Sequence, residues 1–344
     1  MDKKKQMNFN VNNFLLATTN ILDVRDIEMN NVSENHSLRV AYISLKLGEK
    51  LAFEPKKMFD LCAYSLFHNY IDESSMRLLK IDDTNNSLSK VVNFVHSIEE
   101  KFDFSKKGIK NRIIIKEYIS TLKNEKDLKE ILLILCDKID FWLDCQSSQM
   151  IQHYIYSALY DFTEVMDFSE VLEITTMFGS LEYEIDNLLK LSKKMADFYS
   201  FEEKDKWTFL IATSMANFGK LSVPKEILNK SEKLSEEEYE ILKSNLYHNK
   251  NALRSIYGFD DIAKWSSRHQ EQLDGKGYPF GLYANDLSLK DRLMAVINNY
   301  NSMLSSRPYR NKFSHTESID ILNIKEKNYH LDRAIIEDLE KIIE

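Results

Sequence analysis

The stretch from Arg268 to Arg310 constrains this chain more than any other part of its sequence. Glycine and proline are scarce, at 8 and 4 of 344 residues, yet three of these glycines and one proline lie between positions 275 and 281. Because glycine and proline interrupt regular helices, this concentration predicts one specific backbone turn. An ordinary loop between two helices is the alternative that spacing alone leaves open.

Composition elsewhere predicts an all-α chain. Leucine, isoleucine, lysine and glutamate are abundant, and few segments alternate apolar and polar residues as strands do. The hydrophobic fraction of 43% is sufficient for a sizeable core. A net charge of −8 argues against nucleic acid as a partner, because nucleic-acid-binding chains carry basic surfaces.

Three features predict a cytoplasmic protein. Cys62, Cys136 and Cys145 have no Cys-x-x-Cys spacing and lie in apolar or mixed helical surroundings, as expected of reduced, buried thiols. No apolar run reaches the roughly 18 residues of a transmembrane helix, so we expect no membrane span and no membrane partner. The first six residues have no apolar segment behind their charges, unlike a secretory signal peptide.

An internal repeat predicts two tandem helical domains. Shifting residues 35–69 by 148 positions places them on residues 183–217 with matching apolar positions and no gap. We therefore expect one domain over residues 1–165 and a second over residues 166–344. A chance match between two generic amphipathic helices is the alternative, because helical periods align easily.

Capping patterns predict where three helices of the second domain begin. A serine followed three residues later by an acid satisfies two backbone N–H groups at a helix start. The pairs are Ser200 with Glu203, Ser235 with Glu238, and Ser288 with Asp291.

The residues around the turn resemble the signature of HD-GYP domains. Here His269-Gln270-Glu271 precedes Asp274-Gly275-Lys276-Gly277-Tyr278-Pro279-Phe280-Gly281-Leu282, and Arg307-Pro308-Tyr309-Arg310 follows. The family pattern is His-His-Glu, Asp-Gly-x-Gly-Tyr-Pro-x-Gly-Leu, a helix with a metal-binding Asp, and Arg-Pro-Tyr-Arg. HD-GYP domains are metal-dependent phosphodiesterases that cleave the bacterial second messenger cyclic di-GMP. The resemblance covers nearly all of residues 184–343 and, more faintly, residues 35–69, which implies two tandem HD-superfamily helical bundles.

The resemblance also implies where metal ligands belong, and the second domain has lost most of them. The family uses two or three transition metals, held by imidazoles and carboxylates. Alanine has no ligand atom, and asparagine and glutamine offer only a neutral oxygen. His248 lies one turn beyond Asn245 and points in from a displaced position. We therefore expect no metal centre and no catalytic residue in this domain. The matching positions are Glu184, Ala216, Asn217, Asn245, His269, Gln270 and Asn298.

The first domain keeps more of this chemistry. His36 opens a His-x-x-Arg-Val pattern, His68-Asn69 stands at the family's His-Asp pair, and Asp137 resembles the distal aspartate. We expect these four residues to form a weak site for one iron or manganese ion, the only cofactor anticipated, with His96 as a further candidate ligand. The alternative is that the histidines are leftover core or surface residues, since the carboxylate of the pair is gone.

Residues that can meet phosphate survive in the second domain. Lys220, Arg292, Arg307 and Arg310 are cationic, and the guanidinium group suits phosphate geometrically. Tyr278 can stack or hydrogen-bond. We expect Lys220, Tyr278, Arg307 and Arg310 to bind ligand, with structural ion pairs as the alternative role.

Three functional hypotheses follow from the resemblance. The preferred one is a catalytically inactive HD-GYP-like signalling protein that binds cyclic di-GMP, a related nucleotide or a protein partner without cleaving it. The alternative is a residual metal-dependent phosphodiesterase or phosphohydrolase that acts on such nucleotides through His36, His68 and Asp137. The third is an interaction module whose Gly-Tyr-Pro loop docks a protein partner, such as the GGDEF-type cyclases implied for some relatives.

Overall fold

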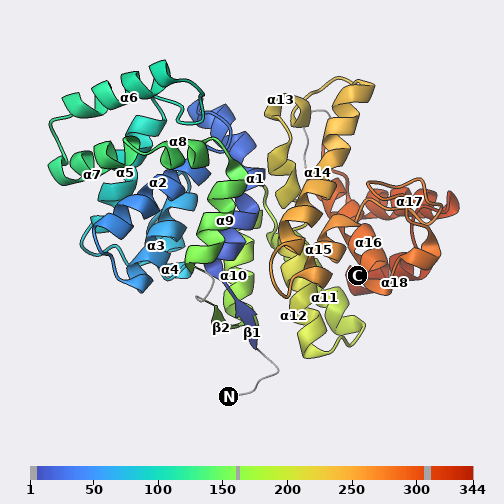
Figure 1. Ribbon diagram of the computed structural model, residues 1–344. Coiled ribbons are helices and arrows are strands. Elements are labelled where there is room, and N and C mark those ends of the chain that lie inside the picture. Colours follow the sequence, from blue (N-terminus) through green and yellow to red (C-terminus); the bar gives the residue numbers. More distant parts are fainter. Residues whose placement is uncertain (1–5, 160–162, 306–310, 344) are drawn as a thin grey trace. The chain divides into compact units, whose positions relative to one another are not determined.

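The computed structural model describes residues 6–159, 163–305 and 311–343, which form two compact units (Figure 1). The N-terminal unit is Asn10–Glu164, and the C-terminal unit combines Met1–Phe9 with Val165–Glu344. The predicted domain boundary lies next to this division. Residues 6–9 nevertheless belong to the C-terminal unit, unlike the prediction, because they form a strand that pairs with residues 164–167.

Helix α2 forms the centre of the N-terminal unit. It packs against α1, α3, α5, α7 and α9, and nearly all of its side chains are buried. A helix that is covered on every side belongs to the interior of a bundle. The helices are α1 (Val11–Asn30), α2 (His36–Lys50), α3 (Pro55–Leu66), α4 (Glu73–Leu78), α5 (Ser87–Glu99), α6 (Ile109–Thr121), α7 (Lys126–Cys136), α8 (Ile139–Cys145) and α9 (Ser148–Leu159).

The C-terminal unit is a second bundle, built around α12 and α16. Helix α12 packs against α10, α11 and α15, while α16 packs against α11, α15, α17 and α18. Strands β1 (Gln6–Phe9) and β2 (Glu164–Asp167) form a two-stranded sheet. The helical elements are α10 (Phe168–Gly179), α11 (Asp186–Phe198), α12 (Glu203–Ser214), 3₁₀ turn η2 (Phe218–Ser222), α13 (Lys225–Leu228), α14 (Glu236–Arg254), α15 (Asp260–Ser267), 3₁₀ turn η3 (Ala284–Asp286), α16 (Leu289–Leu304), α17 (His315–Lys327) and α18 (Arg333–Ile343).

These elements confirm the predicted all-α class. None of the described helices is both long and apolar enough to cross a membrane. The helix pair α2–α3 and the helix pair α11–α12 keep the 148-residue offset, since α3 and α12 have the same length and α2 and α11 end at equivalent positions. These equal spans agree with an internal repeat, whose common origin stays a prediction.

A buried carboxylate shapes the Gly-Tyr-Pro loop, residues 274–282. Glu271, which is 2% exposed, accepts hydrogen bonds from the backbone N–H groups of Phe280 at 2.7 Å and Leu282 at 2.9 Å. The loop also returns to the preceding turn, because the Tyr278 amide donates to the Gln270 carbonyl at 3.2 Å. The loop is therefore held by hydrogen bonds that its backbone N–H groups donate to Glu271 and to the Gln270 carbonyl.

Two glycines are required by the path of this loop. Gly275 has φ of +76°, a left-handed backbone conformation that residues other than glycine rarely adopt. A Cβ atom at Gly277 would lie 2.3 Å from the Gln272 nitrogen and 2.6 Å from the Gln270 carbonyl oxygen. The concentration of glycine in this stretch thus has a steric cause, as its scarcity elsewhere predicted.

Replacing Glu271 with alanine is expected to destabilise the protein by about 1–3 kcal/mol, because two partly buried N–H groups lose their acceptor. The midpoint of urea unfolding measures the change. Glu340→Ala serves as the control, since Glu340 is exposed and a surface change of this kind shifts stability by about 0.5 kcal/mol or less. Equal midpoints for the two variants would contradict the role assigned to Glu271.

Candidate functional site

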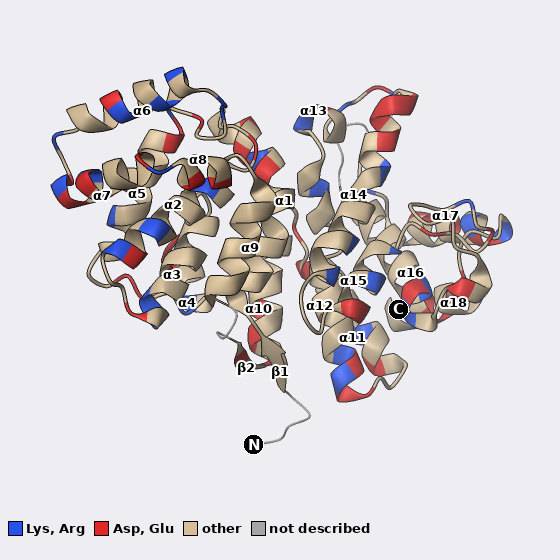
Figure 2. Ribbon diagram, viewed as in Figure 1, with Lys and Arg blue, Asp and Glu red and all other residues tan. Residues whose placement is uncertain are grey.

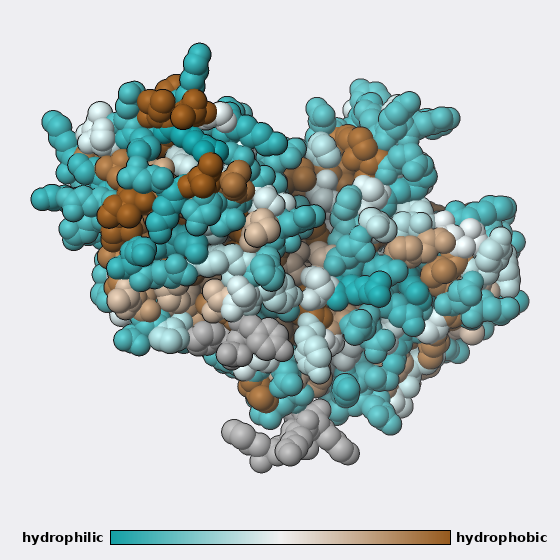
Figure 3. All heavy atoms as spheres, viewed as in Figure 1, coloured by the Kyte–Doolittle hydropathy of each residue, from teal (hydrophilic) through white to brown (hydrophobic). Residues whose placement is uncertain are grey.

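Buried polar side chains point to the candidate sites more clearly than the surface does. The visible surface is mainly hydrophilic with scattered apolar patches, as is usual for folded chains (Figure 3). Buried polar groups, by contrast, need partners to offset lost hydration. The N-terminal unit buries Asp26, His36, Arg39 and Glu99, whereas the C-terminal unit buries Asn245, His269, Glu271 and Asn298 among others.

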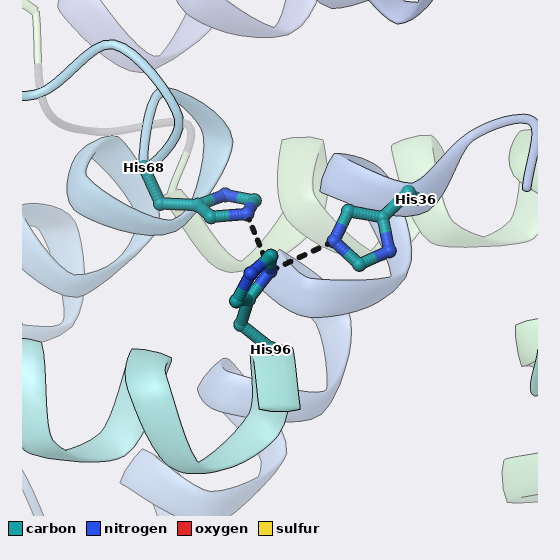
Figure 4. Close-up of side chains that lie close together, drawn as sticks. All are labelled: His36, His68 and His96. Carbon is teal, nitrogen blue, oxygen red and sulfur yellow. Dashed lines mark hydrogen bonds between the residues drawn. The ribbon is translucent and has the colours of Figure 1, made fainter. Parts of the chain in front are cut away.

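Three histidines converge in the N-terminal unit (Figure 4). His36 begins α2, His68 follows α3, and His96 lies in α5. The Nε2 atoms of His36 and His68 each lie 3.0 Å from Nδ1 of His96, and the three nitrogens are all within 4.8 Å of one another. Three imidazole nitrogens at this spacing surround a single point, as the protein ligands of one metal ion do.

The outward nitrogens of two of these rings are fixed by acceptors. Nδ1 of His36 is hydrogen-bonded to the carboxylate of Glu99, which also accepts a hydrogen bond from Nε of Arg39. Nδ1 of His68 donates to the Ser65 carbonyl at 2.7 Å. Such second partners orient metal-binding imidazoles and select the tautomer whose free nitrogen faces the ion.

Burial keeps two of the rings neutral. Desolvation lowers the pKa of His68 to about 3, and the neighbouring His36 and His96 act in the same direction. Desolvation and His36 also lower the pKa of His96. Neutral imidazole is the form that binds metals, so these rings are in the ligand state at neutral pH.

The two remaining residues of the predicted metal site have other partners. Asp137 caps the end of α7, where its side chain is 65% exposed and forms an ion pair with Lys116. The structure therefore does not bring Asp137 to the histidines. Asn69 lies near the buried carboxylate of Asp26, whose pKa burial raises and the Asn69 side chain helps to lower.

Two residues of the site differ from the predicted set. His96, a further candidate in the sequence, completes the cluster in place of Asp137. Glu99 is absent from the sequence prediction. Its position three residues after His96 puts both on one face of α5, and that spacing is the signal that could have identified it.

The C-terminal unit does not fit a metal centre of the kind that the resemblance implies. Asn245 donates its amide to the Leu242 carbonyl, and Asn298 donates to the Met294 carbonyl at 3.2 Å, so both amides are bonded within their own helices. Glu184 is exposed. Within the described residues of this unit, no three His, Cys, Asp or Glu side chains approach closely enough to share an ion.

A cavity of about 620 Å³ is lined in part by Asn245. Its lining includes Tyr183, Lys220, Lys230, His269, Gln270 and Tyr278. The Lys220 ammonium lies 5.3 Å from the centre of the Tyr183 ring. Two of the four predicted ligand-binding residues, Lys220 and Tyr278, thus share one cavity, while Arg307 and Arg310 lie outside the described residues.

Among the described residues that line this cavity, His269 is the one imidazole. It is 2% exposed, and its Nδ1 atom donates to the Ser266 carbonyl at 3.0 Å. Burial, together with the positive charge of Lys220, lowers its pKa to about 4. His269 is consequently neutral at neutral pH, and Lys220 supplies the charge on this side of the cavity.

Comparison with known proteins identifies the second half of the chain. Residues 169–335 match the family model described as HD domain. This part of the chain is an HD domain. A crystal structure of a cyclic GMP-AMP-specific phosphodiesterase from Vibrio cholerae shares the fold of the chain, with a TM-score of 0.57 over 98% of both chains at 14% identity.

Sequence relatives of the chain are named as phosphodiesterases. The 3'3'-cGAMP-specific phosphodiesterase 1 of Vibrio cholerae is 31% identical over 121 residues, covering 35% of this chain and 28% of the relative. A cyclic di-GMP phosphodiesterase of Thermotoga maritima is 30% identical over 169 residues, covering 44% of this chain and 43% of the relative. The chain therefore matches less than half the length of these relatives.

We expect His269 to titrate near pH 4 instead of its usual 6.5, because burial and Lys220 disfavour the imidazolium. Between about pH 4 and pH 6.5 the unfolded chain then binds a proton that the folded chain does not. This contribution to stability is therefore complete above about pH 6.5 and is lost as the pH falls through about 4. NMR titration of the ring, assigned with His269→Asn, measures the midpoint. Lys220→Met should raise it, and a midpoint at 6.5 in the parent chain would contradict the burial argument.

Proposed function

We propose that the HD domain binds a cyclic dinucleotide without hydrolysing it. The observation that carries this proposal is a cationic, aromatic-lined cavity in a domain where amides or alanine stand at most positions at which the resemblance implies metal ligands. Lys220 and Tyr278 line the cavity, and Ala216, Asn245 and Asn298 stand where the resemblance implies metal ligands.

The charge of the cavity favours an anionic ligand. Lys220, Lys230 and Lys233 contribute to the lining, against a single acid, Glu232. Lys230 is partly neutralised by Glu238, 2.6 Å away. Around α13 and α14 basic and acidic residues are mixed (Figure 2), so the excess of lysine is local to the cavity lining. Phosphate groups suit such a site because ammonium groups bind them as point charges.

The size and aromatic content of the cavity favour a nucleotide. Ligand cavities commonly have volumes of about 300–1,000 Å³, and the volume of about 620 Å³ here lies within that range. Tyr183 and Tyr278 provide rings on which bases can stack. The sequence relatives whose names specify cyclic di-GMP or 3'3'-cGAMP as substrates support the cyclic dinucleotide class.

The chemistry of the side chains supports binding without cleavage. Metal-dependent phosphodiester hydrolysis requires ions that generate hydroxide and neutralise phosphate oxygens. The amides of Asn245 and Asn298 carry no charge and are engaged with their own helices. Neutral amides cannot offset a cluster of divalent cations, so the hydrolytic step has no support here.

Calorimetry with cyclic di-GMP and 3'3'-cGAMP tests this proposal on the full chain. We expect saturable binding of at least one of them, and a loss of about 10–100-fold in affinity for Lys220→Ala, since a charged hydrogen bond contributes about 1.5–3 kcal/mol. Lys193→Ala, at an exposed position outside the cavity lining, is the matched control and should bind like the parent chain.

Chromatography of the same ligands after long incubation should recover them intact. Either cleavage by a chain that carries His68→Ala or equal affinities for Lys220→Ala and Lys193→Ala would contradict the proposal.

The three-histidine cluster favours a second candidate, a residual metal-dependent phosphohydrolase in the N-terminal unit. If this unit cleaves nucleotides, His68→Ala should abolish hydrolysis in the presence of zinc, iron or manganese, because the variant loses a ligand nitrogen. Asp137→Asn should retain the activity, since Asp137 pairs with Lys116 away from the cluster. Hydrolysis that survives in His68→Ala would remove this candidate.

A further inference from the structure

We infer that Asn245 and His269 form a pair of hydrogen-bond acceptors that binds the N–H edge of a guanine base in the cavity of the HD domain. This inference rests on the proposed function, because it assigns one part of the proposed nucleotide to two side chains of the same cavity. Both residues are buried, at 3% and 2% exposed, and both line the cavity of about 620 Å³. Lysines of the same lining suit phosphate, whereas this pair suits a group that donates.

The amide of Asn245 presents an acceptor without a partner. Its Nδ2 atom donates to the Leu242 carbonyl within α14, and a carbonyl can only accept, so this bond fixes which end of the amide is nitrogen. The other end, Oδ1, is buried and has no hydrogen-bond partner among the described residues. A buried oxygen without a donor has lost its hydration with no compensation, so it favours a ligand that brings a donor to it.

The His269 ring presents a second acceptor to the same cavity. Its Nδ1 atom carries the proton, because it donates to the Ser266 carbonyl at 3.0 Å. A neutral imidazole has only one N–H group, so Nε2 holds a lone pair. Helix α14 packs against α15, which ends two residues before His269, and this packing brings both acceptors to one cavity (Figure 1).

An aromatic ring for the base belongs to the same part of the domain. Tyr278 lines the cavity, and bases commonly stack on such rings. Its ring contacts that of Tyr239, with centroids 6.2 Å apart in an edge-to-face arrangement. Because Tyr239 lies in α14, this contact holds the Tyr278 ring against the helix that carries Asn245.

Two lone pairs select one kind of base edge. A phosphate oxygen has lone pairs of its own and would face Oδ1 and Nε2 with no proton between them. Adenine places the acceptor N1 beside its amino group, so one of the two contacts would be repulsive. Guanine places N1–H and its 2-amino group side by side, and both donate along the edge that proteins read in unpaired bases. The pair therefore favours guanine over adenine.

Basicity assigns each donor of guanine to one acceptor. N1–H is the more acidic donor of the base, and the imidazole nitrogen is a more basic acceptor than an amide oxygen. Nε2 of His269 accordingly accepts from N1–H, and Oδ1 of Asn245 accepts from the 2-amino group. A guanine analogue without the 2-amino group would leave Oδ1 of Asn245 unpaired in the complex.

Inosine analogues test this assignment on the full chain. Hypoxanthine, the base of inosine, keeps N1–H and lacks only the 2-amino group of guanine. Calorimetry compares cyclic di-GMP or 3'3'-cGAMP, whichever binds more tightly, with the analogue in which hypoxanthine replaces guanine. We expect the parent chain to bind the analogue about 10–100-fold more weakly, because a buried acceptor then stays unpaired.

A matched pair of variants locates the effect at Asn245. Asn245→Leu removes the acceptor and keeps a branched side chain, so it should bind the guanine ligand and its analogue with equal affinity. Asn251→Leu makes the same change at an exposed position of α14 outside the cavity lining, and it should keep the preference of the parent chain. Circular dichroism reports whether both variants fold. Should Asn245→Leu not fold, the comparison of ligands on the parent chain decides.

Equal affinities of the parent chain for the guanine ligand and its analogue would overturn the inference and leave the proposed function standing. A preference that survives in Asn245→Leu, or one that is lost in Asn251→Leu, would overturn it as well. If neither nucleotide binds the parent chain, the proposed function and this inference are both wrong. Lys220→Ala should weaken the binding of both ligands and leave their ratio unchanged, since Lys220 contributes charge and no contact to the base.

Discussion

A buried carboxylate whose oxygens are engaged on both sides holds each of the two candidate sites. Glu99 lies between Arg39 and His36, and Glu271 accepts two backbone N–H groups of the Gly-Tyr-Pro loop. Burying a carboxylate is unfavourable unless it is paired or hydrogen-bonded, so each acid fixes the groups that satisfy it. The orientation of the His36 ring and the path of the loop both depend on this constraint.

The two units carry different parts of the ligand chemistry that the resemblance implies. The N-terminal unit has three imidazoles whose nitrogens converge, and Asn69 stands where the resemblance implies an acid. The C-terminal unit retains the loop and a lysine-lined cavity, while its amides bond to their own helices. The proposals accordingly assign metal binding and ligand binding to different units of the same chain.

Local sequence patterns predicted helix starts well where the cap involves only neighbouring residues. The capping boxes at Ser235 and Ser288 are both present. The one expected at Ser200 is wrong: α12 begins at Glu203 with Glu202 as its N-cap. Ser200 instead has φ of +51° in the turn that ends α11, where the next amide donates to the Ala196 carbonyl. Ser200 therefore belongs to the turn that ends α11, and the predicted capping box at the start of α12 does not form.

The sequence by itself determined the all-α class, the glycine-dependent loop and the neutral amide side chains at positions 245 and 298, because helical periodicity, backbone freedom and side-chain chemistry are properties of short segments. Only the tertiary structure decided that His96 joins His36 and His68 while Asp137 pairs with Lys116. Those residues lie on separate helices, and which side chains meet depends on how α2, α3 and α5 pack, which no single segment encodes.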